Sequence, residues 1–458
     1  MNYKRHYSQT FRVVSCLGRS LWFHNWTCIR FSWKFKLKKS LFNFSNTYIK
    51  LPKDFYQKIQ PVPVKNPKLI EFNTELSRFL NINPNKINQE NGKLIFSGNI
   101  LPVGSEPIAM AYAGHQFGNF VPQLGDGRAV LIGELIAKNG KRFDLQLKGS
   151  GKTAFSRQGD GRSPIGPVIR EYLVSEALHH LGVKSTRSLA IVSTGEKVIR
   201  EEPINGGILT RVASSHIRIG TFELFFFRKD FKSLKKLADY TIERHFNEFH
   251  KKNPYEYLLE NVIKLQASLV AKWMSIGFIH GVMNTDNTSI SGETIDYGPC
   301  AFMDHYIPNK VFSYIDHSGR YSFNNQGKIM LWNLSKFAES IMPLLDKNFD
   351  NSRQKAIYYL KKFPKYFEDN WLREMRKKFG FKKKLSDDLN LINDFFEIIK
   401  KEKLDYTLAF RSLSKILMGE KNNFYKIRKN KVEEFKRWIT RWNKRLESEN
   451  YQKSTMQK

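Results

Sequence analysis

The sequence predicts an α+β protein of two lobes, a sheet-rich N-terminal lobe and a helical C-terminal lobe. Between residues 98 and 225, short apolar runs alternate with glycine turns, which is typical of strands. From Leu234 onward, apolar residues recur at helical spacing. A polar loop, residues 280–299, lies at the junction of the two patterns. A chain of 458 residues is long enough for two lobes, each with its own core.

The hairpin expected in the N-terminal lobe has the clearest turn chemistry. Asn139-Gly140 separates two strand-like runs, as in a tight hairpin. The helix after it has Pro167 near its start and Gly182 at its end. Beyond Leu331 the chain reads as amphipathic helices. The expected elements are strands 129–136, 142–149, 188–194 and 206–213, and helices 167–182 and 255–276.

Three segments are expected along the chain. Residues 1–60 form a basic leader, 61–228 the N-terminal lobe and 229–458 the C-terminal lobe. The leader has no acidic residue before Asp54, which is typical of an organelle transit peptide. A disordered leader upstream of the folded domain is the alternative. We therefore expect a cytoplasmic protein, or a mitochondrial one if the leader is a transit peptide.

Cysteine usage agrees with a reducing compartment. The three cysteines, Cys16, Cys28 and Cys300, form no CxxC pair, so neither a disulfide scaffold nor a cysteine zinc site is expected.

The net charge of +33 permits two interpretations, a nucleic-acid partner or lysine-rich helix faces in solvent. The basic runs lie in the leader and in the C-terminal helices, without the interleaved aromatic strands of RNA-binding modules. A nucleic-acid partner is therefore not expected. No apolar run approaches the roughly 18 residues of a membrane span, so none is expected.

The loop HGVMNTDNTSISGETIDYGP carries the most informative polar residues. Asp296 and the amide oxygen of Asn287 are hard ligands of the kind that Mg²⁺ prefers beside phosphates. Asp286 is a second carboxylate, free to accept a proton from an attacking hydroxyl. The alternative is a metal-free, solvent-exposed turn in which these side chains cap backbone amides.

Residues upstream favour a nucleotide site. The turn Gly125-Asp126-Gly127-Arg128 precedes a strand, so its backbone amides could approach phosphates. Lys148 ends the next strand and Glu171 lies in the following helix. Protein kinases present their parts in this order, which predicts a protein-kinase-like bilobal fold. The alternative for Lys148 and Glu171 is an ordinary surface ion pair.

Two features depart from the kinase pattern. Asp286 and Asn287 are adjacent, whereas kinases separate these residues along the catalytic loop. Arg128, Arg211 and Arg218 supply more positive charge than a kinase uses on one triphosphate. This surplus suggests that the phosphates are held along their length.

Several longer motifs resemble one family. They are YAGHQFGNFVPQLGDGRAVLIGE, LKGSGKTAFSRQGDGRS, IREYLVSEALHHLGV, TRVASSHIRIGTFE, the loop quoted above, GRYSFNNQ and LWNL. Together they resemble the selenoprotein O (SelO) family, a kinase-like fold that works as a protein adenylyltransferase. The resemblance runs from about Pro61 to about Arg445, and the leader has no evident counterpart in it.

The resemblance implies that ATP binds in a flipped orientation and that AMP is transferred to Ser, Thr or Tyr hydroxyls of protein substrates, with release of pyrophosphate. It implies contacts to ATP from Gly125, Gly127, Arg128, Lys148, Asp160, Gly161, Arg211, Arg218 and Asp296. Asp286 would be the proton acceptor, and Asn287 and Asp296 would hold Mg²⁺ or Mn²⁺. Glu171 would be the ion-pair partner of Lys148.

Other expectations stay open beside this resemblance. The family usually continues to a terminal cysteine or selenocysteine, which this chain lacks, so C-terminal redox control is not expected. A monomer is expected. The alternative functions are a phosphotransferase that moves the γ-phosphate and an inactive nucleotide- or nucleic-acid-binding scaffold.

Overall fold

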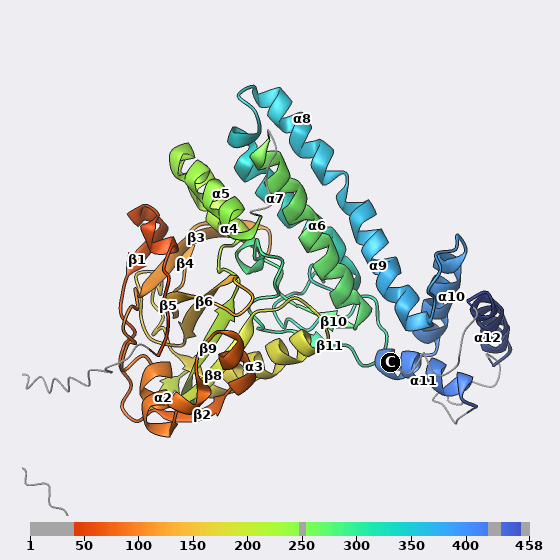
Figure 1. Ribbon diagram of the computed structural model, residues 1–458. Helices are drawn as coiled ribbons and strands as arrows, with labels where there is room; N and C mark the ends of the chain where they lie inside the picture. Colours follow the sequence, from red (N-terminus) through yellow and green to blue (C-terminus); the bar gives the residue numbers. More distant parts are fainter. Residues whose placement is uncertain (1–40, 247–252, 420–431, 450–458) are drawn as a thin grey trace, which may run out of the picture. The chain divides into compact units, whose positions relative to one another are not determined.

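A computed structural model describes residues 41–246, 253–419 and 432–449 (Figure 1). The leader up to residue 40 lies outside the described residues, as do Cys16 and Cys28. The described chain has strands in its N-terminal part and helices in its C-terminal part, which agrees with the predicted α+β class.

The N-terminal part is built on one nine-stranded sheet among the described residues. Its main path runs β1-β3-β5-β6-β9-β8-β2, while β4 pairs with β3 and β7 with β9. All of these pairs are antiparallel. The strands are β1 (Tyr56–Lys58), β2 (Lys68–Phe72), β3 (Ile108–Gln116), β4 (Asn119–Gly125), β5 (Ala129–Ile136), β6 (Arg142–Lys148), β7 (Ser163–Pro164), β8 (Arg187–Ile199) and β9 (Pro203–Ala213).

The hairpin β5–β6 forms where the sequence predicts it. Asn139 accepts a hydrogen bond from the Lys141 amide through its side chain, and Gly140 takes a positive φ of 74°. The resulting register places Ala129 opposite Lys148. Lys148 therefore lies directly beside the glycine turn that precedes β5.

Three helices accompany the sheet, α1 (Thr74–Phe79), α2 (Gln89–Phe96) and α3 (Ile165–His180). Helix α3 agrees with the predicted helix 167–182 and packs against β8 and β9. Glu171 is buried on α3. The sheet-facing side of α3 therefore carries a charge.

The C-terminal part is helical, and none of its described helices is long and apolar enough to cross a membrane. The helices are α4 (Ile219–Phe227), α5 (Phe231–His245), α6 (Pro254–Ser275), α7 (Gln326–Leu345), α8 (Phe349–Leu360), α9 (Phe363–Phe379), α10 (Asp388–Lys401), α11 (Tyr406–Leu417) and α12 (Val432–Glu447). The predicted helix 255–276 corresponds to α6.

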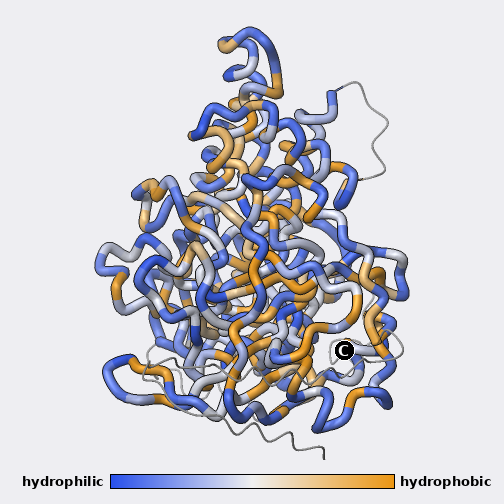
Figure 2. The backbone as a smooth tube through the Cα atoms, turned by 90° about the vertical axis from the view of Figure 1, so that its left-hand side faces the viewer, coloured by the Kyte–Doolittle hydropathy of each residue, from blue (hydrophilic) through white to orange (hydrophobic). Residues whose placement is uncertain are grey.

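Hydrophobic packing joins the two parts. Helix α4 contacts β3 and α7, so it bridges the sheet and the helices. The largest apolar cluster spans β3 and α4 to α7, and a second one gathers α9 to α12. Figure 2 shows hydrophobic residues mainly on inner segments of the chain. Helix α4 thus connects β3 of the sheet to the helical part.

The segment 41–60, which the sequence analysis placed in the leader, packs on the sheet. Phe42, Tyr48 and Phe55 are each at most 2% exposed. The amide of Tyr48 donates to Glu134 on β5 at 2.6 Å. The described fold thus begins upstream of the expected boundary at residue 61, because aromatic side chains in this segment fill the core.

Candidate functional site

The loop 280–300 is anchored at both ends. Short strands β10 (Phe278–Ile279) and β11 (Ala301–Phe302) pair and close it. The ring of His280 bonds the carbonyl of Ile295 at 2.8 Å, which joins its two arms. Most residues of the loop are buried, and Thr285–Asn287 form one turn of 3-10 helix. The alternative of a solvent-exposed turn is therefore wrong.

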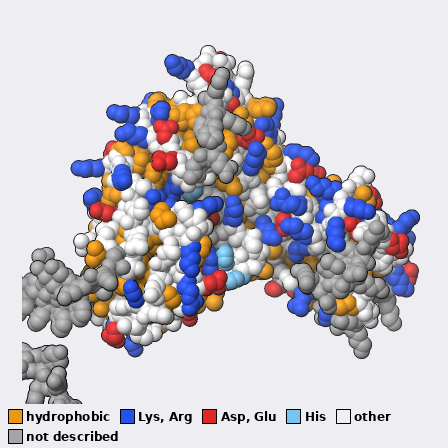
Figure 3. Space-filling model, viewed as in Figure 1, with side chains coloured by type: hydrophobic (Ala, Val, Ile, Leu, Met, Phe, Trp, Pro, Cys, Tyr) orange, Lys and Arg blue, Asp and Glu red, His pale blue; other side chains and the backbone are white. Residues whose placement is uncertain are grey.

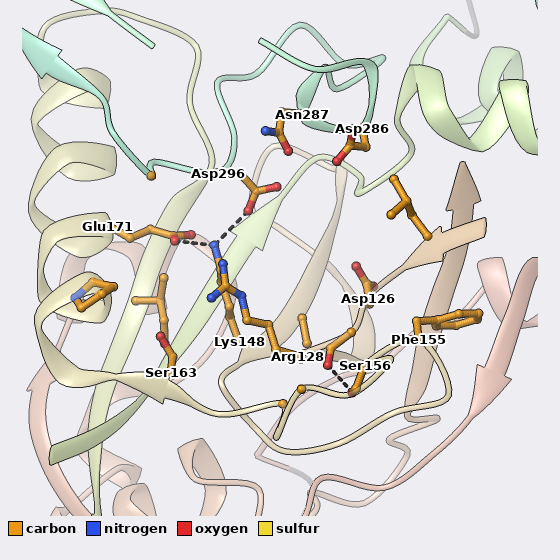
Figure 4. A pocket seen from close by; sticks show the side chains of 18 of the residues that line it. Asp126, Arg128, Lys148, Phe155, Ser156, Ser163, Glu171, Asp286, Asn287 and Asp296 are labelled. Carbon is orange, nitrogen blue, oxygen red and sulfur yellow. Dashed lines mark hydrogen bonds and ion pairs between the residues drawn. The ribbon is translucent and has the colours of Figure 1, made fainter. Parts of the chain in front are cut away.

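One cavity of about 510 Å³ lies between this loop, the sheet and α3 (Figure 4). Its volume suits a small-molecule ligand. All twelve residues singled out in the sequence line it. They are Gly125, Gly127, Arg128, Lys148, Asp160, Gly161, Glu171, Arg211, Arg218, Asp286, Asn287 and Asp296.

A buried cluster of charges occupies one side of the cavity. Lys148 Nζ lies 2.7 Å from Glu171 Oε2 and 2.9 Å from Asp296 Oδ1 (Figure 4). Arg211 Nη2 bonds the same two carboxylates, at 2.5 Å and 2.7 Å. Arg218 Nη1 reaches Asp296 Oδ2 at 2.5 Å. The pair of Lys148 and Glu171 is thus part of a buried network and not a surface ion pair.

This cluster controls the ionisation of Asp296. Burial by itself would raise the pKa of Asp296, but the charges of Arg211, Lys148 and Arg218 hold that pKa well below its usual range. Asp296 also has a positive φ of 64°, which is uncommon for a residue other than glycine. Its carboxylate is therefore ionised and held in a constrained backbone position.

Three of the four predicted phosphate-binding cations form ion pairs within the cavity. Lys148, Arg211 and Arg218 are paired with acids. The Arg128 side chain makes no ion pair with a described residue. The cavity lining as a whole has six Lys or Arg and five Asp or Glu side chains, so it is nearly balanced. A triphosphate, with about four negative charges, needs additional positive charge here.

Asp286 has the opposite environment to Asp296. Its Oδ2 accepts one hydrogen bond, from Gln116 Nε2 at 3.1 Å, and its buried Oδ1 has no partner among the described residues. Burial raises the pKa of Asp286 to about 6. The neighbouring strand approaches so closely that a Cβ on Gly114 would lie 2.6 Å from Oδ1. Asp286 is thus a confined carboxylate suited to accepting a proton.

The donor set fits a divalent cation. The amide nitrogen of Asn287 donates to the carbonyl of Val282 at 3.1 Å, which leaves its oxygen available. With the carboxylate of Asp296, this gives two hard oxygen donors of the kind that Mg²⁺ binds beside phosphates. No group of three or more His, Cys, Asp or Glu placed to hold a metal occurs in the described part of the chain. The smaller set suits a metal that keeps water and phosphate ligands.

The glycines of the cavity wall allow close packing between two segments of the chain. A Cβ on Gly125 would lie 2.3 Å from the Phe155 ring, and one on Gly127 would lie 2.7 Å from the Phe155 carbonyl oxygen. A Cβ on Gly161 would lie 2.1 Å from the carbonyl oxygen of Gly151. These glycines therefore allow the segment 151–161 to fold onto the turn. That packing by itself requires glycine at these positions, and the approach of their amides to phosphate stays a prediction.

Two further acidic residues, Asp160 and Asp126, lie at the rim and wall of the cavity. Asp160 pairs with Arg200 at 2.9 Å and is exposed. Asp126, which lay in the quoted turn without an assigned role, is buried and accepts from Gln146 Nε2 at 3.0 Å. Burial raises the pKa of Asp126, although Arg218 opposes this rise.

The sequence did not predict the residues that position the turn Thr285–Asn287, which carries Asp286. Glu223 on α4 bonds His115 Nδ1 and the Thr285 hydroxyl, each at 2.5 Å. The amide of His115 donates to the same hydroxyl at 2.7 Å. Thr285 is adjacent to Asp286, so this network positions the carboxylate. Gln116 was missed as well, because these contacts join distant segments and leave no local pattern.

A cavity with paired cations, a confined carboxylate and a cation-binding donor set is typical of nucleotidyl- and phosphoryl-transfer enzymes. The chain belongs to a family of protein adenylyltransferases. A family model described as protein adenylyltransferase SelO matches residues 39–458. The match includes residues 39–60, so the expectation that no family counterpart precedes Pro61 is wrong in part.

Similar proteins carry a consistent description. The chain is 50% identical over 415 residues to a protein nucleotidyltransferase YdiU of Maridesulfovibrio salexigens, covering 90% of this chain and 84% of that protein. It is also 50% identical over 408 residues to the protein of the same name from Nitrobacter hamburgensis, covering 89% and 81%. A third relative with this name, from Clostridium botulinum, is 50% identical over 405 residues, covering 88% and 81%.

Proposed function

We propose that this chain transfers AMP from ATP to Ser, Thr or Tyr hydroxyls of protein substrates and releases pyrophosphate. Family membership supports ATP as the donor and proteins as acceptors. The observation that carries the proposal is the buried Asp286 carboxylate, which has one unpaired oxygen and shares a cavity with Asp296 and its cations.

A protein-kinase-like arrangement of two lobes, 61–228 and 229–458, is part of this proposal. The order of Lys148, Glu171, Asp286 and Asp296 along the chain supports it. The cavity lies where the sheet, α3 and the loop 280–300 meet, as a nucleotide site between two lobes would.

In the proposed reaction the acceptor hydroxyl oxygen bonds to the α-phosphorus as the bond from that phosphorus to the bridging oxygen of pyrophosphate breaks. The hydroxyl proton passes to Asp286, whose unpaired Oδ1 can receive it. A pKa near 6 keeps Asp286 ionised at neutral pH while leaving it basic enough to accept a proton.

The cations stabilise the leaving group. Lys148, Arg211 and Arg218 are held by Glu171 and Asp296, so they are oriented before ATP binds. Arg128 adds a cation at the glycine turn, and Gly125, Gly127, Asp160 and Gly161 form the adjoining wall. Asn287 and Asp296 would hold Mg²⁺ or Mn²⁺, which when bound supplies positive charge beside the phosphates.

The position of a radioactive label decides which group is transferred. The purified chain is incubated with an acceptor protein and ATP labelled on either the α- or the γ-phosphate. Adenylyl transfer predicts label in the acceptor from α-labelled ATP only. Label from γ-labelled ATP only would contradict the proposal and favour the phosphotransferase that the kinase-like order of residues suggests.

The matched control is Asp286→Asn, which keeps the side-chain volume and removes the proton acceptor. The α-label in the acceptor is expected to fall by about 10²–10⁴-fold. If the variant labels the acceptor as fast as the original chain, the assignment of Asp286 fails although adenylyl transfer itself still stands.

A further inference from the structure

A second and larger cavity lies apart from the nucleotide site. Its volume is about 1020 Å³, twice that of the first, and no residue lines both. It is formed by the end of the β5–β6 hairpin, the C-terminal end of α5, part of α6 and the segment around Lys50. Ser291, from the loop that carries Asp286 and Asp296, also lines it.

This second cavity, called the rear cavity below, has a strongly basic lining. Among the described residues, one acidic side chain, Glu243, lines it. Six cationic side chains do so, Lys50, Lys141, Arg142, Lys184, Arg244 and Lys264. Since they come from separate segments of the chain, the fold and not a local charge run brings them together. Basic side chains elsewhere are scattered over the face shown in Figure 3, on both the sheet and the helical parts.

Acids behind the wall neutralise the arginines. Glu134 accepts from Arg244 Nη1 at 2.8 Å, from Thr47 and from the amide of Tyr48. Asp144 accepts from Arg244 Nη2 at 2.5 Å and from His216. These carboxylates are at most 2% exposed. Their oxygens accept hydrogen bonds from groups inside the wall, so these carboxylates do not neutralise the lysines that line the cavity.

Arg142 and Lys264 on the wall have acidic neighbours, whereas three lysines leave positive charge uncompensated. Arg142 Nε lies 3.7 Å from Glu134, and its buried Nη1 has no hydrogen-bond partner among the described residues. Lys264 pairs with Glu260 at 3.4 Å. Lys50, Lys141 and Lys184 are exposed and make no ion pair with any residue in the described ranges.

We propose that the rear cavity binds a free small molecule that carries two or more phosphate groups. Cations converging on a concave surface with low-dielectric walls concentrate anions. The cavity volume suits a ligand of nucleotide size. A single phosphate would leave several lysines unpaired, whereas two or more phosphate groups can contact lysines from different segments at once.

Calorimetric titration with inorganic tripolyphosphate tests this site. The double variant Lys141→Glu/Lys184→Glu reverses two cavity charges. The matched control Lys138→Glu/Lys197→Glu makes the same change in net charge at exposed lysines that line neither cavity. Lys148→Ala weakens the nucleotide site alone.

Two binding events are expected in the original chain and in the control. The cavity variant should lose one event, or bind at that site at least about tenfold more weakly, because charge-assisted contacts are lost. Lys148→Ala should affect only the other event. The cavity variant should keep its adenylyl-transfer rate within about twofold, which shows that it folds. Equal binding by the cavity and control variants, or a single event that Lys148→Ala removes, would overturn the proposal.

Discussion

Asp286 and Asp296 lie ten residues apart in one loop and face one cavity, yet their surroundings are opposite. Three cations surround Asp296 and keep its pKa low. Asp286 has one amide donor, and burial raises its pKa to about 6. The comparison shows that the surrounding groups determine the role of each aspartate. Cations keep Asp296 ionised, whereas burial makes Asp286 a better proton acceptor.

The largest effect is expected on turnover. Asp296→Ala should abolish metal-dependent transfer, because it removes a metal ligand and the anchor of three cations. Asp286→Ala should lower kcat by about 10²–10⁴-fold, since only the proton acceptor is lost. Single-turnover transfer of α-label measures both. Comparable residual rates in the two variants would remove the distinction between them.

Stability should change in opposite directions when each carboxylate becomes an amide. Asp296→Asn should lower the free energy of unfolding by about 3 kcal/mol at pH 7, because buried cations lose their partner. Asp286→Asn should raise it by about 2 kcal/mol, because ionising this buried group opposes folding above its unfolded pKa. Urea denaturation measures both values. A lower free energy of unfolding in Asp286→Asn would show that burying the ionised Asp286 carboxylate does not destabilise the fold.

The two carboxylates should also differ in their effect on the pH profile. The raised pKa of Asp286 means that it keeps its proton up to about pH 6. We therefore expect kcat/KM to be level above pH 6 and to fall about tenfold per unit below it. Asp296, with its lowered pKa, should contribute no decline in this range. A profile that stays level down to pH 4 would contradict the assignment of Asp286.

A smaller shift is expected at Gln116, whose amide stabilises the ionised form of Asp286. Gln116→Leu should move the midpoint of the kcat/KM profile upward by less than about one pH unit. Gln123→Leu, at an exposed position outside the cavity lining, is the control. A downward shift in the Gln116 variant would mean that the amide does not favour the ionised carboxylate.

Local patterns in the sequence were sufficient for much of the fold. The hairpin β5–β6 and helices α3 and α6 carry their own turn and capping signals, so their positions could be predicted. The segment 41–60 could not, because its burial depends on aromatic contacts with the distant helices α2, α4 and α5. Similarly, no local sequence pattern predicts the hydrogen bond between the Tyr48 amide and the Glu134 carboxylate.

The candidate site divides in the same way. Motifs identified which residues gather around the cavity, and the structure brings all twelve to it. How they pair depends on the sheet register, which sets Arg211 opposite Gln146 and so beside Glu171. The support of Asp286 by Glu223 and Gln116 likewise comes from tertiary packing. Residue identity was therefore predictable, but the charge state of each group was not.

ATP affinity with and without Mg²⁺, measured by calorimetry on the original chain, Asp286→Asn and Asp296→Asn, tests the division of roles most directly. The account predicts that Mg²⁺ tightens binding at least about tenfold in the original chain and in Asp286→Asn. In Asp296→Asn the affinity should be the same with and without the metal. An undiminished gain from Mg²⁺ in Asp296→Asn would contradict the account.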